Sequence, residues 1–322
     1  MTEFEKSITN FNQQLNVDHI KYFNTEKLKS AKQRTDGIII AGMGGSGLAG
    51  RILRDIRHEI NLNIPIKIWP DYNLPKHSFK NPLIIYTSFS GDTAETVSSY
   101  LSGKKFIRAV VTTGGQLKKI AEKDKVPLAL FEAGNLQPRQ ATGFCFYAIL
   151  GLLKNTFPKL KVLNMDKSIN TKKNQLLGKE LADRLAKKII MIYTTSNNSH
   201  LAYNWKIRLN ETSKALAFYN IVPEMCHNEI VSFDNDFKNF ICIFLNDSND
   251  NPENKKRIKI ISQLLKNRNI DYLNINLKGK NVFQKVFQSI NLADWLSYYL
   301  ALNNNQNPED IKIINQLKKS MA

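Results

Sequence analysis

The chain has 322 residues, of which 42% are hydrophobic and 23% are charged. This length suits two domains of ordinary size, each able to bury its own core. With only 15 Gly and 10 Pro, the composition excludes collagenous, coiled-coil and wholly disordered proteins. No run of about 18 apolar residues occurs, so the sequence predicts no membrane-spanning helix and no membrane partner.

The charge balance is strongly basic, with 46 Lys and Arg against 28 Asp and Glu and a formal net charge of +18. Such a balance fits a nucleic-acid-binding protein, a surface that attracts small anions, or a solvated lysine-rich surface. The basic clusters resemble exposed helix faces, and neither zinc-finger spacing nor basic–aromatic alternation accompanies them. We therefore expect no nucleic-acid partner.

The cellular compartment is indicated by the start of the chain and by its cysteines. The opening MTEFEKSITN carries acidic residues where a secretory signal would be basic and then apolar. The three cysteines, Cys145, Cys226 and Cys242, form no CxxC pair, and an odd number suits reduced thiols better than a disulfide framework. We expect a cytoplasmic protein.

Apolar strands alternate with helices along the first half. The predicted strands are 37–43, 64–69, 81–88, 106–113 and 126–131, and the predicted helices are 44–56, 90–101, 116–124 and 141–153. This alternation is typical of a parallel sheet covered on both faces by helices. A lysine-rich stretch over 154–173 looks like a connection between two halves.

The same pattern resumes in the second half. The predicted strands are 188–195, 237–245 and 270–277, with helices over 174–186 and after SNNSH, Pro252, Val282 and Pro308. The sequence thus predicts an α/β fold of two doubly wound parallel-sheet domains, 1–155 and 156–322. The segments YTSFSGDT and YTTSNNSH suggest distant copies, but they are too short to establish a repeat.

A glycine-rich turn, GMGGSG, joins the first predicted strand to its helix. Gly42, Gly44 and Gly47 match the G-x-G-x-x-G pattern of dinucleotide-binding domains, which is a weak signal by itself. The acidic residue expected on a ribose would be Asp71, which lies farther on than the usual spacing. This motif alone leaves nicotinamide binding and an ordinary strand–helix turn open.

A second polar turn, TSFSGDTAET, follows the third predicted strand. Ser88, Ser90 and Thr93 place three hydroxyls beside the first turn of a helix, whose free N–H groups attract anions. Either Ser90 or Thr93 alone would be explained by helix capping. Together with the glycine turn, the three hydroxyls favour a phosphate-binding site.

The segments GMGGSGLAG and SFSGDTAET resemble the first half of a SIS (sugar isomerase) domain. PRQATGF and NETSKALAFYNIVPEMCHNEIVSF are similar to the bifunctional phosphoglucose/phosphomannose isomerase family, which has two SIS domains and acts as a dimer. The resemblance implies two SIS-type domains, a phosphosugar substrate, and an N-terminal domain that binds the phosphate. The residues implied in phosphate binding are Gly45, Ser46, Ser88, Ser90 and Thr93.

Aldose–ketose isomerisation needs a base that moves a proton between adjacent carbons, an acid that opens the sugar ring, and a cation that steadies the enediolate. The resemblance implies that Glu211 is the base, that His227 opens the ring from the partner subunit, and that Arg139 stabilises the enediolate. Glu224 and Glu229 are rival carboxylates near Glu211 in the sequence. Neither a metal ion nor a cofactor is expected.

Two departures from the family pattern bear on specificity. The resemblance implies a C-terminal lysine near the site, for which Lys318 is the candidate beside Lys319, but NPEDI has no threonine where the family has one. That threonine is associated with acceptance of both C2 epimers, so mannose 6-phosphate is a less secure substrate than glucose 6-phosphate. Asp92 replaces the usual asparagine of the hydroxyl-rich turn and would repel phosphate unless it points away.

Other classes of protein fit less well. A non-catalytic SIS-domain regulator that binds a phosphosugar remains the alternative, but no segment is left over for a DNA-binding domain. An amidotransferase-like sugar synthase would need an N-terminal cysteine nucleophile. A zinc-dependent phosphomannose isomerase would need clustered ligands, and the five histidines lack ligand spacing.

Overall fold

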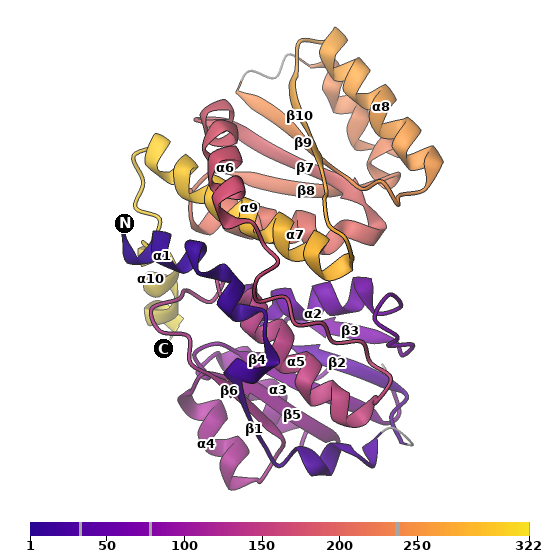
Figure 1. Cartoon of the computed structure of the whole chain (residues 1–322), viewed down its shortest axis with the longest axis vertical. Helices are drawn as coiled ribbons and strands as arrows, with labels where there is room; N and C mark the ends of the chain where they lie inside the picture. Colours follow the sequence, from indigo (N-terminus) through magenta and orange to yellow (C-terminus); the bar gives the residue numbers. More distant parts are fainter. Residues whose placement is uncertain (32–33, 77–78, 236–238, 322) are drawn as a thin grey trace. The chain divides into compact units, whose positions relative to one another are not determined.

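The computed structural model describes residues 1–31, 34–76, 79–235 and 239–321. They form two compact units, each around its own sheet (Figure 1). The N-terminal unit consists of Asn10–Ile169 and Asn281–Gln284, and the C-terminal unit consists of Met1–Thr9, Asn170–Lys280 and Lys285–Ala322. The division into functional domains at residue 155 stays a prediction, while the chain itself passes from one unit to the other between Ile169 and Asn170.

The sheet of the N-terminal unit has the order β1-β6-β5-β4-β2-β3. Its strands are β1 (Ile20–Phe23), β2 (Gly37–Ala41), β3 (Ile66–Trp69), β4 (Pro82–Ser88), β5 (Ile107–Thr112) and β6 (Leu128–Phe131). All neighbours pair in parallel except β1 and β6, which are antiparallel. The five predicted strands are confirmed, and β1 is an edge strand that sequence analysis missed.

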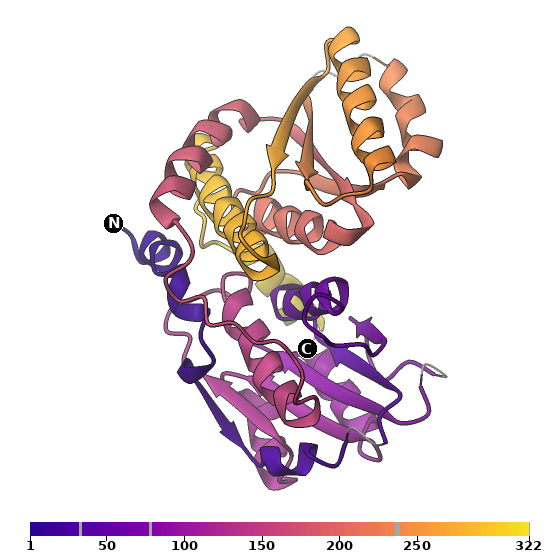
Figure 2. The same ribbon diagram turned by 45° about the vertical axis from the view of Figure 1, so that its right-hand side comes forward.

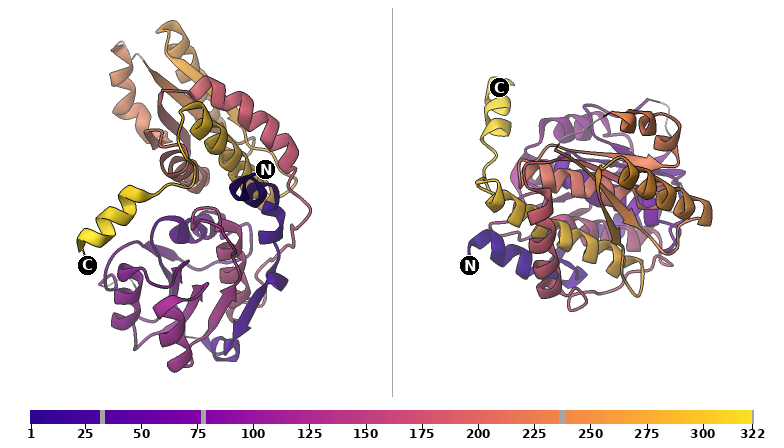
Figure 3. Two further views of the ribbon diagram at one scale, coloured as in Figure 1. Left: turned by 90° about the vertical axis from the view of Figure 1, so that its left-hand side faces the viewer. Right: turned by 90° about the horizontal axis from the view of Figure 1, so that it is seen from above.

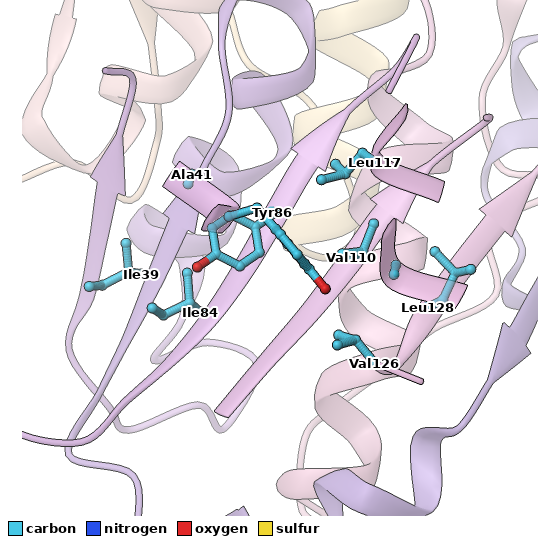
Figure 4. Packing of buried hydrophobic residues seen from close by; sticks show 10 residues of the cluster. Ile39, Ala41, Ile84, Tyr86, Val110, Leu117, Val126 and Leu128 are labelled. Atoms are coloured by element: carbon cyan, nitrogen blue, oxygen red, sulfur yellow. The ribbon is translucent and has the colours of Figure 1, made fainter. Parts of the chain in front are cut away.

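Helices cover both faces of this sheet because both faces are apolar. On one face, Ile39, Tyr86 and Val110 pack against Leu117 of α4 (Gly115–Lys123), with α3 (Ala94–Ser102) beside it (Figure 4). Helices α2 (Gly44–Ile56) and α5 (Thr142–Thr156) pack against each other and against the strands of the other face. β2 and β4 are therefore buried along their whole length.

The sheet of the C-terminal unit has the order β10-β9-β7-β8 and is parallel throughout. Its strands are β7 (Ile189–Thr195), β8 (Ala217–Val222), β9 (Phe240–Asn246) and β10 (Asp271–Asn276). The predicted strand 237–245 begins with residues 237 and 238, which lie outside the described residues. In both units the first parallel strand has the second on one side and the third and fourth on the other, so the predicted doubly wound α/β fold is confirmed.

Each face of the C-terminal sheet has its own helices. Ile258 and Leu265 of α8 (Pro252–Asn267) pack with Tyr193 and Phe244 on one face. Helices α6 (Thr171–Leu185), α7 (Ser199–Glu211) and α9 (Val282–Asn303) are joined by buried polar contacts. Figure 2 shows α8 (orange) and α9 (yellow) with the sheet between them.

The N-terminal and C-terminal helices both belong to the C-terminal unit. Helix α1 (Glu3–Thr9) packs through Phe4 and Ile8 on Trp295 and Tyr298 of α9. Helix α10 (Lys312–Met321) buries none of its residues and lies apart from the C-terminal sheet in both views of Figure 3. Within the described residues, every helix is too short or too polar to cross a membrane.

A buried ion pair joins α7 to α9. The Nε atom of Arg208 donates to Oδ1 of Asp294 at 2.7 Å, and the two side chains are 0% and 6% exposed. Arg208 also donates to the Asn204 side chain one turn earlier, at 2.9 Å. A charge held this far from water depends on its counter-charge, so the pair fixes how α7 lies on α9.

The Asp294→Ala variant is expected to lower the free energy of unfolding by about 3–5 kcal/mol, because the buried guanidinium loses its carboxylate. Urea unfolding followed by tryptophan fluorescence measures this, since Trp205 and Trp295 are buried in the same unit. The control is Asp234→Ala, which removes an exposed carboxylate paired with Arg268 and should cost less than about 1 kcal/mol. Equal losses in the two variants would contradict the prediction.

Candidate active site

The candidate site is built where β2 and β4 end side by side. The two strands pair in parallel, with Ala41 opposite Tyr86, so both deliver their following turns to the same edge of the sheet. Helix α2 begins at Gly44, directly after β2, and α3 begins at Ala94 after the turn that follows β4. Two helix N-termini, each with free N–H groups, therefore open toward one edge, where ligands of doubly wound sheets bind.

Two glycines allow the backbone to pack closely at this edge. A Cβ atom on Gly42 would lie 2.0 Å from Oγ1 of Thr87, and one on Gly45 would lie 2.5 Å from the backbone nitrogen of Arg139. Neither position has room for a larger residue without displacing backbone or buried atoms. Gly45 thus brings the first turn of α2 against the segment that carries Arg139.

Ser46 joins the two turns. Its Oγ accepts a hydrogen bond from the Phe89 backbone N–H at 2.8 Å, and its carbonyl accepts one from the Thr87 hydroxyl at 3.0 Å. Thr87 is not among the site residues predicted from the sequence. In the sequence, Thr87 is only one more hydroxyl residue at the end of an apolar strand, which does not distinguish it from its neighbours. These bonds hold the start of α2 against the end of β4.

The turn after β4 is organised by its own hydroxyls. Ser88 Oγ accepts from the Gly91 N–H at 3.0 Å and lies 2.9 Å from Oγ1 of Thr93, while Ser90 Oγ accepts from the Asp92 N–H at 3.2 Å. Ser88 is buried, Thr93 is half-buried and Ser90 is exposed. A hydroxyl that accepts a hydrogen bond can still donate its own proton, so these groups can donate to a phosphate oxygen.

Asp92 does not face the hydroxyls of its own turn. Its Oδ1 accepts from the backbone N–H of Gln116 at 2.8 Å, in the first turn of α4. The carboxylate thereby satisfies a free N–H at a helix N-terminus, where negative charge is favoured. Asp92 fastens the turn after β4 to α4, and its charge is directed to that helix.

Arg139 comes to the same edge from the segment before α5. It is only 1% exposed, and its carbonyl accepts from the Thr142 hydroxyl at 3.1 Å. Its backbone packs against Gly45. The N-terminal unit thus gathers all five predicted phosphate-binding residues and the predicted enediolate-stabilising arginine around one edge of its sheet. We call Gly45, Ser46, Ser88, Ser90 and Thr93 the phosphate cradle.

The other predicted catalytic residues belong to the C-terminal unit. Glu211 is the half-buried last residue of α7, and its carbonyl accepts from Nζ of Lys214 at 3.1 Å. His227 is exposed at the end of the short helix η6 (Glu224–His227), which follows β8. Lys318 is exposed on α10. Their catalytic roles stay predictions.

The structure separates Glu211 from its two rivals. Both carboxylate oxygens of Glu229 accept hydrogen bonds from side chains of the sheet, those of Tyr193 and Asn220. Glu224 is exposed, and its Oε1 accepts from the side chain of Asn228 at 3.2 Å within the same loop. The bonds to Glu229 give it a structural role, while the catalytic role of Glu211 stays a prediction.

In the C-terminal unit, the strands that correspond to β2 and β4 are followed by different residues. In the sheet order, β7 corresponds to β2, and β9 corresponds to β4. YTTSNNSH begins at the end of β7 and YTSFSGDT at the end of β4, so the two similar segments belong to strands that do not correspond. After β9, Asp247 and Asp250 are 6% and 3% exposed, and Lys285 Nζ lies 2.8 and 2.7 Å from the two Asp247 oxygens. Two buried carboxylates oppose a phosphate dianion here.

The pKa values of these two carboxyl groups are shifted in opposite directions. Burial by itself raises the pKa of Asp247, but hydrogen bonding and charge from Lys285 hold that pKa below its usual value. Burial raises the pKa of Asp250, against the opposing hydrogen bond that Thr195 donates to it. Among the side chains that the structure describes, no three His, Cys, Asp or Glu are grouped so that they could hold a metal ion.

Comparison with known proteins shows the family of this chain. Residues 174–321 match the family model of the bacterial phospho-glucose isomerase C-terminal SIS domain. A bifunctional phosphoglucose/phosphomannose isomerase of Caldicellulosiruptor bescii is 32% identical over 309 residues, covering 89% of this chain and 90% of that protein. One of Thermoplasma volcanium is 31% identical over 295 residues, covering 89% and 92%. The chain belongs to the bifunctional phosphoglucose/phosphomannose isomerase family.

Solved structures show that the fold of this family member extends to other sugar-phosphate proteins. Glucosamine-6-phosphate deaminase from Thermotoga maritima superimposes with a TM-score of 0.70 at 12% identity, covering 96% of this chain and 97% of that one. At that identity the likeness concerns the fold alone. The predicted resemblance to the isomerase family and the predicted SIS-type architecture are confirmed.

The bond from Gln116 to Asp92 generates a prediction for the phosphate cradle. Asp92→Ala should weaken the affinity for inorganic phosphate about tenfold, because the turn loses one charge-assisted hydrogen bond to α4. Asp92→Asn keeps an acceptor oxygen and should bind at least as well as wild type. Isothermal titration calorimetry measures both affinities. Unchanged binding by Asp92→Ala would show that the cradle does not depend on this bond.

Proposed function

We propose that this member of the phosphoglucose/phosphomannose isomerase family is an aldose–ketose isomerase that interconverts fructose 6-phosphate and glucose 6-phosphate. The printed names of its relatives support the reaction class. The observation that carries the proposal is the phosphate cradle, where the hydroxyls of Ser46, Ser88, Ser90 and Thr93 meet two helix N-termini at one sheet edge.

In this proposal the cradle binds the phosphate and thereby fixes the sugar chain. The hydroxyls of Ser90 and Thr93 donate hydrogen bonds to phosphate oxygens, and the backbone N–H groups at the N-termini of α2 and α3 donate further ones. Binding energy from the phosphate, which does not react, orients the carbons that do. The buried Arg139, packed against Gly45, is placed at the same edge to balance the negative charge of the enediolate.

Proton transfer is assigned to Glu211. Its carboxylate removes a proton from C1 of the open-chain ketose and the enediolate carries the charge. A proton then passes from the hydroxyl on C1 to the oxygen on C2, and the same carboxyl group returns its proton to C2, which leaves the aldehyde at C1. In the reverse direction the proton moves from C2 to C1. The resemblance to the family supports this role, and the hydrogen bonds from Tyr193 and Asn220 give the rival Glu229 a structural role instead.

We assign ring opening to His227 and propose that it acts in the partner subunit of a homodimer. A histidine suits this step because its ordinary pKa lies near neutrality, so it can donate and accept protons at working pH. The exposure of its side chain supports a role at the surface of the subunit.

Lys318 is assigned a supporting cationic role near the substrate. A cytoplasmic location is supported by the three free cysteines.

The isomerase proposal predicts turnover of fructose 6-phosphate in the presence of EDTA and its loss in Glu211→Gln. The variant keeps the size of the side chain but cannot accept the proton, so kcat should fall by about 10³-fold while substrate binding persists. The measurement is a coupled assay that detects glucose 6-phosphate and mannose 6-phosphate separately. Glucose 6-phosphate should be the main product, since NPEDI lacks the family's threonine.

The matched control is Glu180→Gln, the same substitution at an exposed position of α6. It should turn over like wild type. Normal activity in Glu211→Gln would show that another carboxylate is the base. Binding of the phosphosugar without any turnover by the wild type would instead support a non-catalytic regulator.

The shared-subunit proposal predicts complementation between two inactive variants. Glu211→Gln and His227→Ala, mixed in equal amounts and allowed to exchange subunits, should recover about a quarter of wild-type activity, because half of the dimers are mixed and each carries one intact site. Size-exclusion chromatography with differently tagged chains establishes that mixed dimers form. Mixed dimers without activity would place His227 in the site of its own chain.

A further inference from the structure

Glu229 is held by the sheet of the C-terminal unit through both of its carboxylate oxygens. The hydroxyl of Tyr193, in β7, donates to Oε1 at 2.7 Å, and the side-chain amide of Asn220, in β8, donates to Oε2. Tyr193 is fully buried, and Glu229 and Asn220 are half-buried. One carboxylate therefore bridges two neighbouring strands from a loop that lies beyond them.

This loop carries His227 between two fixed points. On one side, Met225 is fully buried in the core formed by β7, β9 and α8. On the other side is Glu229, whose backbone N–H donates to Oδ1 of Asn228 at 2.6 Å. His227 stands between these two fixed residues at the end of η6, with its side chain exposed. The position of the imidazole thus depends on how Glu229 is held.

The bond from Tyr193 is suited to a permanent anchor. Burial, followed by the nearby Cys242 and by Glu229 itself, raises the pKa of Tyr193 above its ordinary value, so the hydroxyl keeps its proton at working pH. A hydroxyl that stays protonated remains a donor, and its bond to a carboxylate is of the stronger, charge-assisted kind. The anchor is therefore present throughout the range in which a histidine titrates.

We propose that Glu229 is a positioning residue for ring opening, which acts by fixing the loop that presents His227. The inference rests on the proposed function, since it assigns a task to the histidine of that reaction. Proton transfer to a ring oxygen requires a donor within hydrogen-bond reach, and a small displacement costs much of the rate. Glu229 contacts neither substrate nor reacting atoms and works through the geometry of the 224–229 loop.

The test compares a substrate that must be opened with one that is always open. Fructose 6-phosphate closes its ring through the oxygen on C5, whereas 5-deoxyfructose 6-phosphate lacks that oxygen and stays in the open chain. The proton step can be followed for both by proton NMR in D₂O, as exchange of a C1 hydrogen for deuterium. Only the first substrate needs His227, while both need Glu211.

Glu229→Ala is expected to slow exchange in fructose 6-phosphate about tenfold in kcat, with KM nearly unchanged, and to leave exchange in 5-deoxyfructose 6-phosphate within about twofold of wild type. Tyr193→Phe removes one of the two anchoring donors and should show the same selectivity in weaker form. It serves in place of Glu229→Ala if that variant does not fold. Glu229→Gln keeps an acceptor for the Tyr193 hydroxyl and should restore most of the rate.

Two controls separate positioning from general damage. Asp234→Asn changes an exposed carboxylate at the end of the next short helix, η7 (Glu229–Asp234), and should behave like wild type with both substrates. In a His227→Ala background, Glu229→Ala should cause no further loss with fructose 6-phosphate, because the group that it positions is absent.

Several outcomes would overturn the inference. Equal slowing of both substrates by Glu229→Ala would indicate a structural role alone, and no slowing of either would show that the anchor is dispensable. A further loss in the His227→Ala background would show that Glu229 acts independently of His227. If the wild-type protein does not accept the open-chain compound, this double-variant comparison is the one that tests the inference. Absence of exchange in both substrates with wild-type protein would refute the isomerase proposal itself, an outcome distinct from all the others.

Discussion

The parallel pairing of β2 with β4 is the constraint on which the candidate site depends. Because the two strands run side by side in the same direction, the glycine turn and the hydroxyl turn emerge together, and two helix N-termini face one edge. Ser46 then locks one turn to the other through the Phe89 N–H. Hydroxyls and N–H groups that are far apart in the sequence come together at one edge of the sheet only through this pairing, and we propose that they bind phosphate there.

The C-terminal unit repeats the strand order and changes the chemistry. Its first and third parallel strands, β7 and β9, are paired as β2 and β4 are, yet the turn after β9 presents Asp247 and Asp250 in place of hydroxyls. Lys285 neutralises part of that charge from α9. The same strand order thus carries a hydroxyl-rich turn in one unit and a buried network of carboxylates and lysine in the other.

In this basic chain, several carboxylates join secondary-structure elements through hydrogen bonds or ion pairs. Asp92 fastens the phosphate cradle to α4, Asp294 holds the buried Arg208, and Glu229 bridges β7 and β8. Asp294 and Glu229 accept from buried or half-buried side chains that would otherwise lose hydrogen bonds on burial. Glu211, the last residue of α7, is the carboxylate that we propose to move protons.

The sequence by itself determined the α/β class and most of the parallel strands, because long apolar runs are local signals, and its clustered Gly, Ser and Thr predicted the phosphate cradle. Strands β1 and β8 were missed because each is a short run interrupted by a polar residue, Lys21 in β1 and Asn220 in β8. Only the tertiary structure decided where Asp92 and Glu229 point. Their hydrogen-bond partners Gln116 and Tyr193 lie 24 and 36 residues away in the chain, and no local pattern records a contact that sheet pairing creates.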